Sequence, residues 1–288
     1  MITPVASLAT DGAEWVMGWI AARFGDGLTA TRYRRSWEKI HAYLNAKGIH
    51  CLSAITRQTC YDYFLWRTDA ARNTAYAELR VLSVVLKEAV LRGLISANPC
   101  VQLGIKRLPA KKTKPEYTPE VLDEIERCIA QETGKHRDFY RISFAIARYH
   151  GVRIHETRFP LHWVDFTNNT ITFRQKGQID RTVPLHPKLR PVLLELVERG
   201  QGWTFSEPSN PSYMSTYWQK FLKRHGFIGR IPNACFHALR VTTISRLARK
   251  NISEAKAKRY VGHANSAVHA IYQRVRVSDL EDCVHALE

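Results

Sequence analysis

The stretch GVRIHETRFPLHWVDFTNNTITFRQKGQIDRTVPL, residues 151–185, decides the fold because the hydrophobic pattern of the chain changes within it. Short runs rich in β-branched and aromatic residues occupy 163–166, 170–174 and 181–185, and an Asn-Asn pair and a Lys-Gly pair separate them. Such runs between turn-forming pairs predict a three-stranded antiparallel meander. Before and after this stretch, apolar residues recur at helical spacing. The chain is therefore predicted to be mainly α with a small antiparallel β-meander, an α+β fold.

The composition points to a polyanionic partner. The chain has 288 residues, with 43 Lys and Arg against 26 Asp and Glu, a net charge of +17. Each phosphate that Lys or Arg neutralises releases condensed counterions, so this excess favours nucleic acid. A basic membrane-surface protein and a purely solubilising charge are the alternatives. No long apolar run predicts a membrane span and the N-terminus does not resemble a signal peptide, so a cytoplasmic, nucleoid-associated protein is expected.

Residues 1–107 have helical spacing and no strand pattern. Helices are expected around residues 15–24, 29–48, 57–68 and 74–94. In the second of these, Tyr33, Trp37 and Ile40 share an apolar face. Four basic residues lie on its other side: Arg32, Arg34, Arg35 and Lys39. This region is predicted to be a small all-α domain.

Residues 108–116, LPAKKTKPE, combine two prolines with three lysines and show no periodicity. An ordinary exposed loop is one interpretation of this segment. The other, which suits a link between two basic domains, is a tether that follows a DNA backbone through Lys111, Lys112 and Lys114. The predicted organisation is thus a helical domain over 1–107, a basic linker over 108–116 and a second domain over 117–288.

The second domain begins with a strong helix signal. Thr118-Pro119-Glu120 combines a capping residue, a proline at the first helical position and an acid in the first turn. Another helix is expected over 139–150, before the meander. After the meander the spacing is helical again, over 188–199, 211–225, 237–250, 253–261 and 265–275.

Four short segments of the second domain carry residues suited to phosphate chemistry. They are GVRIHE at 151–156, RQKGQIDRTVPL at 174–185, HALR at 237–240, and VGH at 261–263 with Tyr272 after it. Each segment alone is a weak signal, since a lone His-x-x-Arg arises by chance in many proteins. Together they supply six residues of the required types in a fixed order.

This order and spacing resemble the tyrosine recombinase (phage integrase) family, in its two-domain type typified by Xer and Cre proteins. The resemblance covers about residues 10–276 and implies a helical core-binding domain followed by an integrase-type catalytic domain. It implies catalytic roles for six residues: Arg153, Lys176, His237, Arg240, His263 and Tyr272. It also implies that cleavage leaves a 3′-phosphotyrosine and a free 5′-hydroxyl, and that strands exchange through a Holliday junction.

The chemistry explains why these residue types are needed. Rejoining DNA requires a nucleophile that keeps the phosphate covalently bound, and the phenol of Tyr272 can do this reversibly. The guanidinium groups of Arg153 and Arg240 would clamp the non-bridging oxygens, on which charge develops in the transition state. No metal or other cofactor is expected, because these two arginines supply the charge that Mg²⁺ supplies in other nucleases.

The remaining site residues have supporting parts. Lys176, at the tip of the predicted hairpin, is the candidate general acid for the departing 5′-oxygen. His237 and His263 are further donors to the phosphate, and His237 is also a candidate acceptor of the tyrosine proton. Glu156, three residues after Arg153 on the same predicted helical face, either orients an active-site arginine or histidine or is a surface acid.

Three other functions are compatible with parts of this pattern. A type IB topoisomerase would use the same phosphotyrosine chemistry, but the compact N-terminal domain and the tail after Tyr272 favour a recombinase. A non-catalytic DNA-binding regulator on the same scaffold would have no reason to keep all six residues. An RNA-binding protein would need an aromatic strand motif that the sequence lacks.

The expected partners are double-stranded DNA with an inverted-repeat core site and three further copies of the chain. In the tail 277–288, Val277, Leu280, Val284 and Leu287 have helical spacing, and acidic residues lie on the other side. Family resemblance favours docking of this tail on a neighbouring copy, giving a tetramer on DNA. Folding back on its own domain is the alternative. No membrane association is expected.

Overall fold

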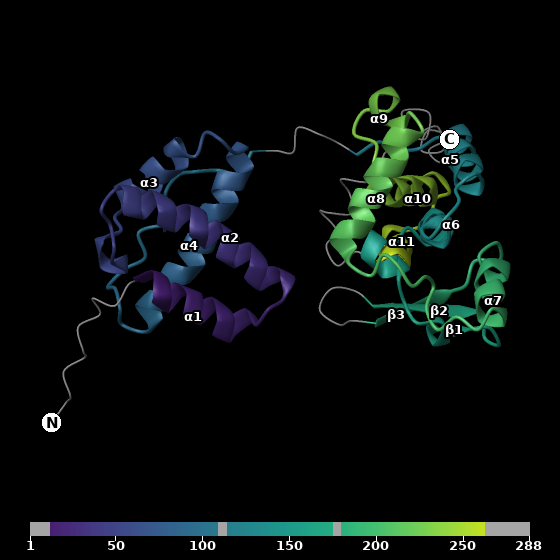
Figure 1. The fold of residues 1–288 in the computed structure, drawn as a ribbon, viewed down its shortest axis with the longest axis horizontal. Helices are drawn as coiled ribbons and strands as arrows, with labels where there is room; N and C mark the ends of the chain where they lie inside the picture. The colour runs from purple at the N-terminus through teal and green to yellow at the C-terminus, as the bar shows by residue number, and fades with distance from the viewer. Residues whose placement is uncertain (1–11, 109–113, 175–179, 263–288) are drawn as a thin grey trace, which may run out of the picture. The chain divides into compact units, whose positions relative to one another are not determined.

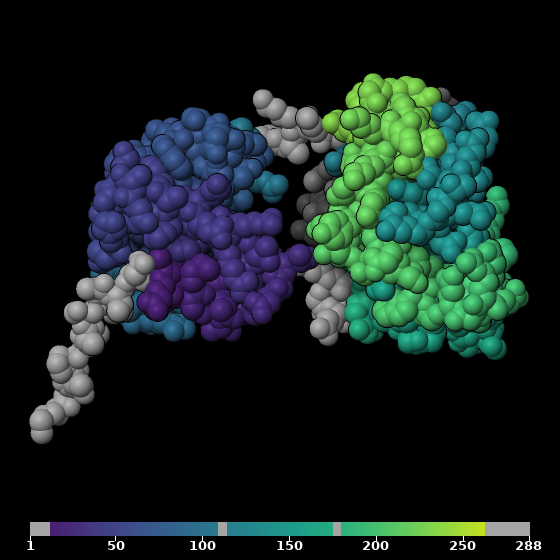
Figure 2. All heavy atoms as spheres, in the orientation of Figure 1, coloured from purple at the N-terminus to yellow at the C-terminus, as the bar shows by residue number. Residues whose placement is uncertain are grey.

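The computed structural model describes residues 12–108, 114–174 and 180–262 (Figure 1). The chain divides into two compact units, Met1–Ala110 and Lys111–Glu288, so the boundary falls within the segment 108–116. Figure 2 shows the atoms of the two units, the first in purple and blue and the second in teal to yellow-green. No helix among the described residues is both long and apolar enough to cross a membrane.

The first unit is helical, as predicted. Its elements are α1 (Gly12–Phe24), α2 (Leu28–Ala46), the 3-10 turn η1 (Leu52–Ala54), α3 (Arg57–Trp66) and α4 (Arg72–Leu91). Its core is formed by the apolar faces of these helices, including Val16 and Ile20 of α1, Trp37 and Ile40 of α2, and Leu82 and Leu86 of α4. The fourth helix starts two residues earlier and ends three residues earlier than its expected bounds, while its apolar stripe is the predicted one.

A buried ion pair lies within this helical core. Glu78 of α4 accepts hydrogen bonds from Arg67 Nε at 3.0 Å and Arg67 Nη2 at 3.1 Å, and from the hydroxyl of Tyr63 at 2.7 Å. Glu78 and Arg67 are 6% and 9% exposed, so both charges are compensated inside the protein.

The second unit consists of helices and a small sheet. The helices before the sheet are α5 (Pro119–Ala130) and α6 (Arg137–His150), followed by the 3-10 turns η2 (Ile154–Thr157) and η3 (Leu161–Trp163). Those after it are α7 (Arg190–Glu198), α8 (Pro211–Arg224), α9 (Phe227–Arg230), α10 (His237–Arg249) and α11 (Glu254–Val261). The turns η2 and η3 and the short α9 have no counterpart in the sequence prediction, because a single turn is too short to show periodicity. The helix predicted over 265–275 lies outside the described residues.

The predicted meander is present. Strands β1 (Val164–Asp165), β2 (Thr170–Arg174) and β3 (Asp180–Pro184) form an antiparallel sheet in the order β1-β2-β3. The first strand is shorter than the run 163–166 because Trp163 belongs to η3. In Figure 1 the sheet lies at one end of the unit, with α7 beside it. Arg181 faces inward opposite Phe173, at a position where the alternation of the strand calls for an apolar residue.

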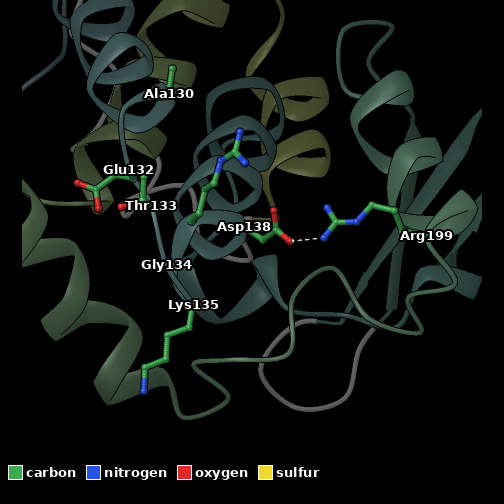
Figure 3. Close-up of a pocket in the computed structure, with 8 residues that line it drawn as sticks. Ala130, Glu132, Thr133, Gly134, Lys135, Asp138 and Arg199 are labelled. Carbon is green, nitrogen blue, oxygen red and sulfur yellow. Dashed lines mark hydrogen bonds and ion pairs between the residues drawn. The ribbon is translucent and has the colours of Figure 1, made fainter.

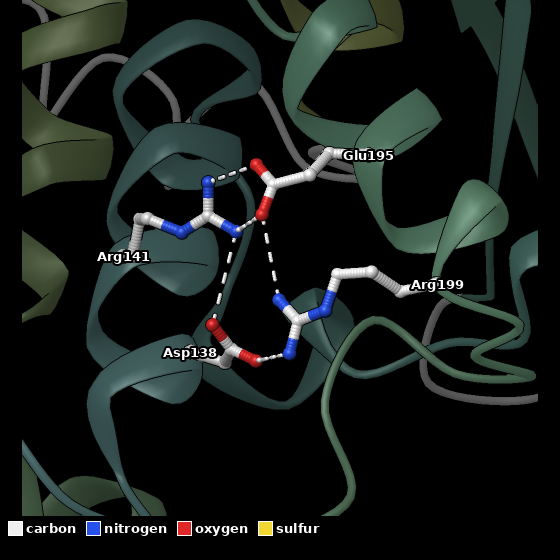
Figure 4. Close-up of polar contacts among 4 residues, drawn as sticks. All are labelled: Asp138, Arg141, Glu195 and Arg199. Atoms are coloured by element: carbon white, nitrogen blue, oxygen red, sulfur yellow. Dashed lines mark hydrogen bonds and ion pairs between the residues drawn. The ribbon is translucent and has the colours of Figure 1, made fainter.

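A polar network joins α6 to α7 on the surface (Figure 4). Glu195 of α7 accepts from Arg141 Nη1 at 2.7 Å and Nη2 at 2.9 Å, a two-pronged contact. Asp138 of α6 in turn accepts from Arg199 Nη2 at 3.2 Å. Because these groups are partly exposed, each pair contributes little stability.

Gly151 allows α6, α10 and α11 to pack closely. Its φ of 60° is left-handed, which ends α6 and turns the chain toward η2. A Cβ at this position would lie 3.0 Å from the side chain of Thr243 and 3.2 Å from that of Val261. A larger residue would therefore separate the helices that hold the candidate site.

Candidate functional site

Arg153 and Glu156 form a hydrogen-bonded pair directly after α6. Arg153 precedes the 3-10 turn η2, and Glu156 in that turn reaches back to it. The backbone N–H of Arg153 donates to Glu156 Oε2 at 2.9 Å, and Arg153 Nη1 donates to Glu156 Oε1 at 2.7 Å. The side chain of Glu156 is 0% exposed and that of Arg153 is 35% exposed. Glu156 is therefore not a surface acid, and the expected common face of one α-helix is replaced by a 3-10 turn capped by its own carboxylate.

Arg240 approaches the same carboxylate from α10. Its Nη1 donates to the carbonyl of Gly151 at 2.7 Å and its Nη2 to the carbonyl of Gly262 at 3.3 Å. Nη1 also lies 3.9 Å from Glu156 Oε2, and the side chain is 1% exposed. The guanidinium is thus fixed where α6, η2 and α11 meet, in the interior next to Glu156.

His237 begins α10 and lines a cavity together with Arg153. This cavity, of about 350 Å³, is also lined by Lys114, Ile154, Ser215, Gln219, Cys235 and Phe236. Burial, together with the nearby charges of Arg240, Lys114 and Arg153, lowers the pKa of His237 to about 4 against the opposing effect of Glu156. His237 is therefore neutral at pH 7, with one ring nitrogen able to donate and the other able to accept a proton.

The described residues include half of the six predicted catalytic positions. Arg153, His237 and Arg240, from two segments far apart in the sequence, come together around Glu156. The other three, Lys176, His263 and Tyr272, lie outside the described residues. The same holds for Lys111, Lys112 and the tail 277–288.

The predicted basic face of α2 has two parts. Arg32, Arg35 and Lys39 are exposed at spacings of three and four residues, so they share one side of the helix. Arg34 instead donates to Asp26 Oδ1 at 2.9 Å and to the carbonyl of Gly25 at 3.0 Å, which ties it to the turn between α1 and α2. Three of the four predicted basic residues are therefore exposed on this helix.

Two features near the site were not predicted from the sequence. The guanidinium nitrogens of Arg181 are buried and have no hydrogen-bond partner within the described parts of the chain, and the group lies over the ring of Phe173 at 4.9 Å. Burial lowers the pKa of Arg181 to about 10 despite the attraction of Glu156. His150, fully buried, contacts the hydroxyl of Tyr260 through Nδ1 at 3.1 Å. A charged residue at an inward strand position is the one sequence signal that singles out Arg181.

A larger cavity, of about 720 Å³, lies away from this site (Figure 3). The loop after α5 forms much of its wall, and the ion pair of Asp138 with Arg199 crosses one side. None of the three described catalytic candidates, Arg153, His237 and Arg240, lines it. Its mixture of both signs of charge gives no preference for a phosphate.

The family model described as "Phage integrase family" matches residues 117–278, more than half of the chain. Tyrosine recombinase XerC of Chlamydia caviae is 22% identical over 230 residues, which cover 75% of this chain and 72% of that protein.

Solved structures share the fold at low sequence identity. A lambda integrase dimer bound to a COC′ core site gives a TM-score of 0.71 at 18% identity, covering 92% of this chain and 94% of that one. XerH site-specific recombinase bound to a palindromic difH substrate gives 0.72 at 17% identity, covering 94% and 83%. The Tn1549 transposon integrase, in complex with a circular intermediate DNA, gives 0.70 at 17% identity, covering 97% and 100%.

The arginines and histidine around Glu156 all fall within the matched region 117–278. The similarity of fold extends over nearly the whole length of the chain. By the extent of the family match, this chain belongs to the phage integrase family, the tyrosine recombinases.

Proposed function

We propose that this chain is a site-specific recombinase that cleaves and rejoins double-stranded DNA through a 3′-phosphotyrosine at Tyr272. The observation that carries the proposal is the cavity shared by Arg153 and His237, with the buried Arg240 behind it and Glu156 joining the two arginines. Family membership supports the same reaction, and the relatives named above include recombinases in complex with DNA.

In this proposal the arginines stabilise the pentacoordinate phosphate. Arg153 has one third of its side chain exposed, so its guanidinium can reach a non-bridging oxygen in the cavity. Arg240 is held by two backbone carbonyls and adds positive charge from behind. Glu156 holds Arg153 through two hydrogen bonds, and the backbone carbonyls hold Arg240, so both guanidinium groups are placed before DNA arrives and little reorganisation is needed during the reaction.

His237 is suited to proton transfer because it is neutral at pH 7. Its lowered pKa leaves a ring nitrogen free of a proton to accept the one that Tyr272 releases. A phosphate in the cavity adds a negative charge, which raises the pKa of His237 and makes the ring a better acceptor. Lys176 would protonate the departing 5′-oxygen, and His263 would donate to the phosphate.

The proposed partners follow from the charge of the chain. Its net charge of +17 suits a duplex, and Arg32, Arg35 and Lys39 form an exposed basic face on α2 of the N-terminal domain, 1–107. The linker 108–116 would follow the DNA backbone to the catalytic domain, 117–288. Two duplexes with inverted-repeat core sites carry four half-sites, so four copies would assemble through the tails 277–288 and exchange strands through a Holliday junction. We place this activity in the cytoplasm, at the nucleoid.

The test is covalent trapping on DNA. Wild-type protein mixed with a nicked suicide duplex should give a protease-sensitive protein–DNA adduct, and Tyr272→Phe should give none while binding the duplex within a few-fold. An adduct formed by Tyr272→Phe would refute the assignment of the nucleophile. Wild-type protein that binds DNA and forms no adduct would instead identify a non-catalytic regulator.

Two further arms test the proposed chemistry. Cleavage should persist in EDTA, because the arginines supply the charge that stabilises the phosphate; a strict Mg²⁺ requirement for the cleavage step would contradict this. Arg153→Lys should cleave on the order of 100-fold more slowly or worse, because an ammonium cannot replace a paired guanidinium donor. A near-normal rate for Arg153→Lys would show that the planar geometry is unimportant.

A further inference from the structure

The cavity shared by Arg153 and His237 has another cationic residue in its wall, Lys114. This lysine comes from the linker and precedes residues 117–278, the region that the family model matches. The sequence pattern suggests a tether along the DNA backbone for it. Its place in the cavity indicates a different role, within the reaction itself.

The residues that follow Lys114 are attached to α10, the helix that begins at His237. The backbone N–H of Tyr117 donates to Thr242 Oγ1 at 2.8 Å, and the Tyr117 hydroxyl donates to the carbonyl of Cys235 at 3.0 Å. Tyr117 is 2% exposed. Because Thr242 belongs to α10 and Cys235 lies two residues before His237, this buried anchor holds the chain after Lys114 along the first half of α10, and Lys114 itself lines the cavity beside His237.

Two features limit how far Lys114 can move from this anchor. Pro115 follows it, which restricts the backbone of Lys114 to extended conformations. Glu116 forms a two-pronged ion pair with Arg249 near the end of α10. Pro115, whose φ is fixed, and the ion-paired Glu116 are the two residues between Lys114 and Tyr117, so the backbone of Lys114 has little freedom to move away from the anchor.

The electrostatics agree with this placement. After burial and Arg240, the charge of Lys114 is the next cause of the low pKa of His237, ahead of Arg153. Among the described residues, Glu156 is the carboxylate that acts on His237, and it already accepts two hydrogen bonds from Arg153. Three cations and one carboxylate thus act on this ring, and the excess of positive charge favours a phosphodiester in the cavity.

We propose that Lys114 is a further catalytic residue, whose ammonium donates to a non-bridging oxygen of the phosphate that is cut. This inference rests on the proposed recombinase function and adds a contact from the linker to it. The ammonium would act as a point charge beside the planar guanidinium of Arg153. Because the linker also joins the two domains, the contact makes cleavage depend on the seating of the linker against α10.

The first experiment measures the single-turnover rate of adduct formation on the nicked suicide duplex, with protein at saturating concentration. Lys114→Ala should lower this rate about 10- to 100-fold, less than the loss expected for a rigid donor. Lys114→Arg should recover part of the rate because it keeps a cation. Lys220→Ala is the matched control, since Lys220 is an exposed lysine on α8 next to Gln219 but is not among the residues that line the cavity.

The outcomes of this experiment separate the two proposals. A Lys114→Ala rate within threefold of wild type, or an equal loss in Lys220→Ala, overturns the role of Lys114 and leaves the recombinase function standing. Absence of any adduct from wild-type protein overturns the proposed function and this inference together. Thermal unfolding of each variant shows whether a slow rate reflects loss of folded protein.

The second experiment tests direct contact between Lys114 and the phosphate by a double-mutant cycle, in which one change removes the lysine and the other removes the charge of the phosphate. Wild-type adducts map the cut position, and a duplex is then made with an uncharged methylphosphonate there. In a Tyr272→Phe background, Lys114→Ala should weaken binding of the natural duplex about tenfold, as expected for a hydrogen bond between charged groups. It should weaken binding of the methylphosphonate duplex by less than about twofold, because the partner charge is gone. Equal losses on both duplexes would overturn the contact.

Discussion

Removing the carboxylate of Glu156 should destabilise the catalytic domain more than any change at an exposed acid. Glu156 accepts two hydrogen bonds from Arg153, at 2.9 and 2.7 Å, and lies 3.9 Å from Nη1 of the buried Arg240. Glu156→Ala leaves Arg240 without its counterion in an interior from which it cannot reach water. Breaking such a buried pair costs about 3–5 kcal/mol.

The lower end of this range is expected for two reasons. Arg153 is 35% exposed, so it can recover hydration after the substitution. Arg240 keeps its hydrogen bonds to the carbonyls of Gly151 and Gly262. We therefore expect a loss of about 3 kcal/mol, which for a domain of this size lowers its Tm by about 6–12 °C. Glu156→Gln keeps one acceptor and should lose about 2 kcal/mol, because its amide nitrogen must face one of the donors of Arg153.

Differential scanning calorimetry of the full chain measures this change, and a matched control identifies the domain that it affects. Glu78 has the same chemistry in the other unit, where it is buried and accepts from Arg67 and Tyr63. Glu78→Ala should lower the free energy of unfolding of the N-terminal domain by a similar amount and leave the saturated cleavage rate unchanged, whereas Glu156→Ala should lower both stability and rate. A Glu156→Ala loss below about 1 kcal/mol would refute the role of this carboxylate as the shared counterion.

Three further predictions concern pH, a buried charge and assembly. Burial is the main cause that lowers the pKa of His150 to about 3 and that of His237 to about 4, whereas both side chains titrate near 6.5 in the unfolded chain. Below pH 6.5 the unfolded state therefore binds more protons than the folded state. The free energy of unfolding should decrease as the pH falls from about 6.5 to 4. Each histidine contributes up to about 1.4 kcal/mol per pH unit to the slope of the unfolding free energy against pH, and His150→Gln should remove the contribution of His150 when urea unfolding is measured from pH 4 to 7. An unchanged slope would contradict the burial of a neutral ring. Arg181→Met should raise the free energy of unfolding by about 1–3 kcal/mol, since it removes a buried guanidinium without a hydrogen-bond partner in the described structure; a loss above 1 kcal/mol would show that the charge is compensated. Deleting 277–288 should preserve binding to a half-site and abolish cooperative binding to a full site in a gel-shift titration, and unchanged cooperativity would show that the tail packs on its own domain.

The sequence by itself determined the elements and the family. Apolar spacing located the longer helices of both units to within a few residues, because an amphipathic helix repeats its pattern over several turns, whereas the single-turn α9 gave no such signal. The alternation over 170–174 and 181–185 located the sheet, because successive side chains of a strand face opposite sides. The order of the motifs from Gly151 to Tyr272 identified the family without any knowledge of contacts.

Only the tertiary structure decided what these residues do to one another. The sequence left Glu156 as either a positioning residue or a surface acid, and its burial between Arg153 and Arg240 depends on α10 packing against the turn after α6. Lys114 lines the cavity of His237, and the chain that follows it is attached to α10 by a hydrogen bond between Tyr117 and Thr242, which are 125 residues apart. The low pKa of His237 likewise comes from burial and from charges on other segments. Burial and electrostatics depend on distances across the fold, and the local pattern of a sequence does not contain them.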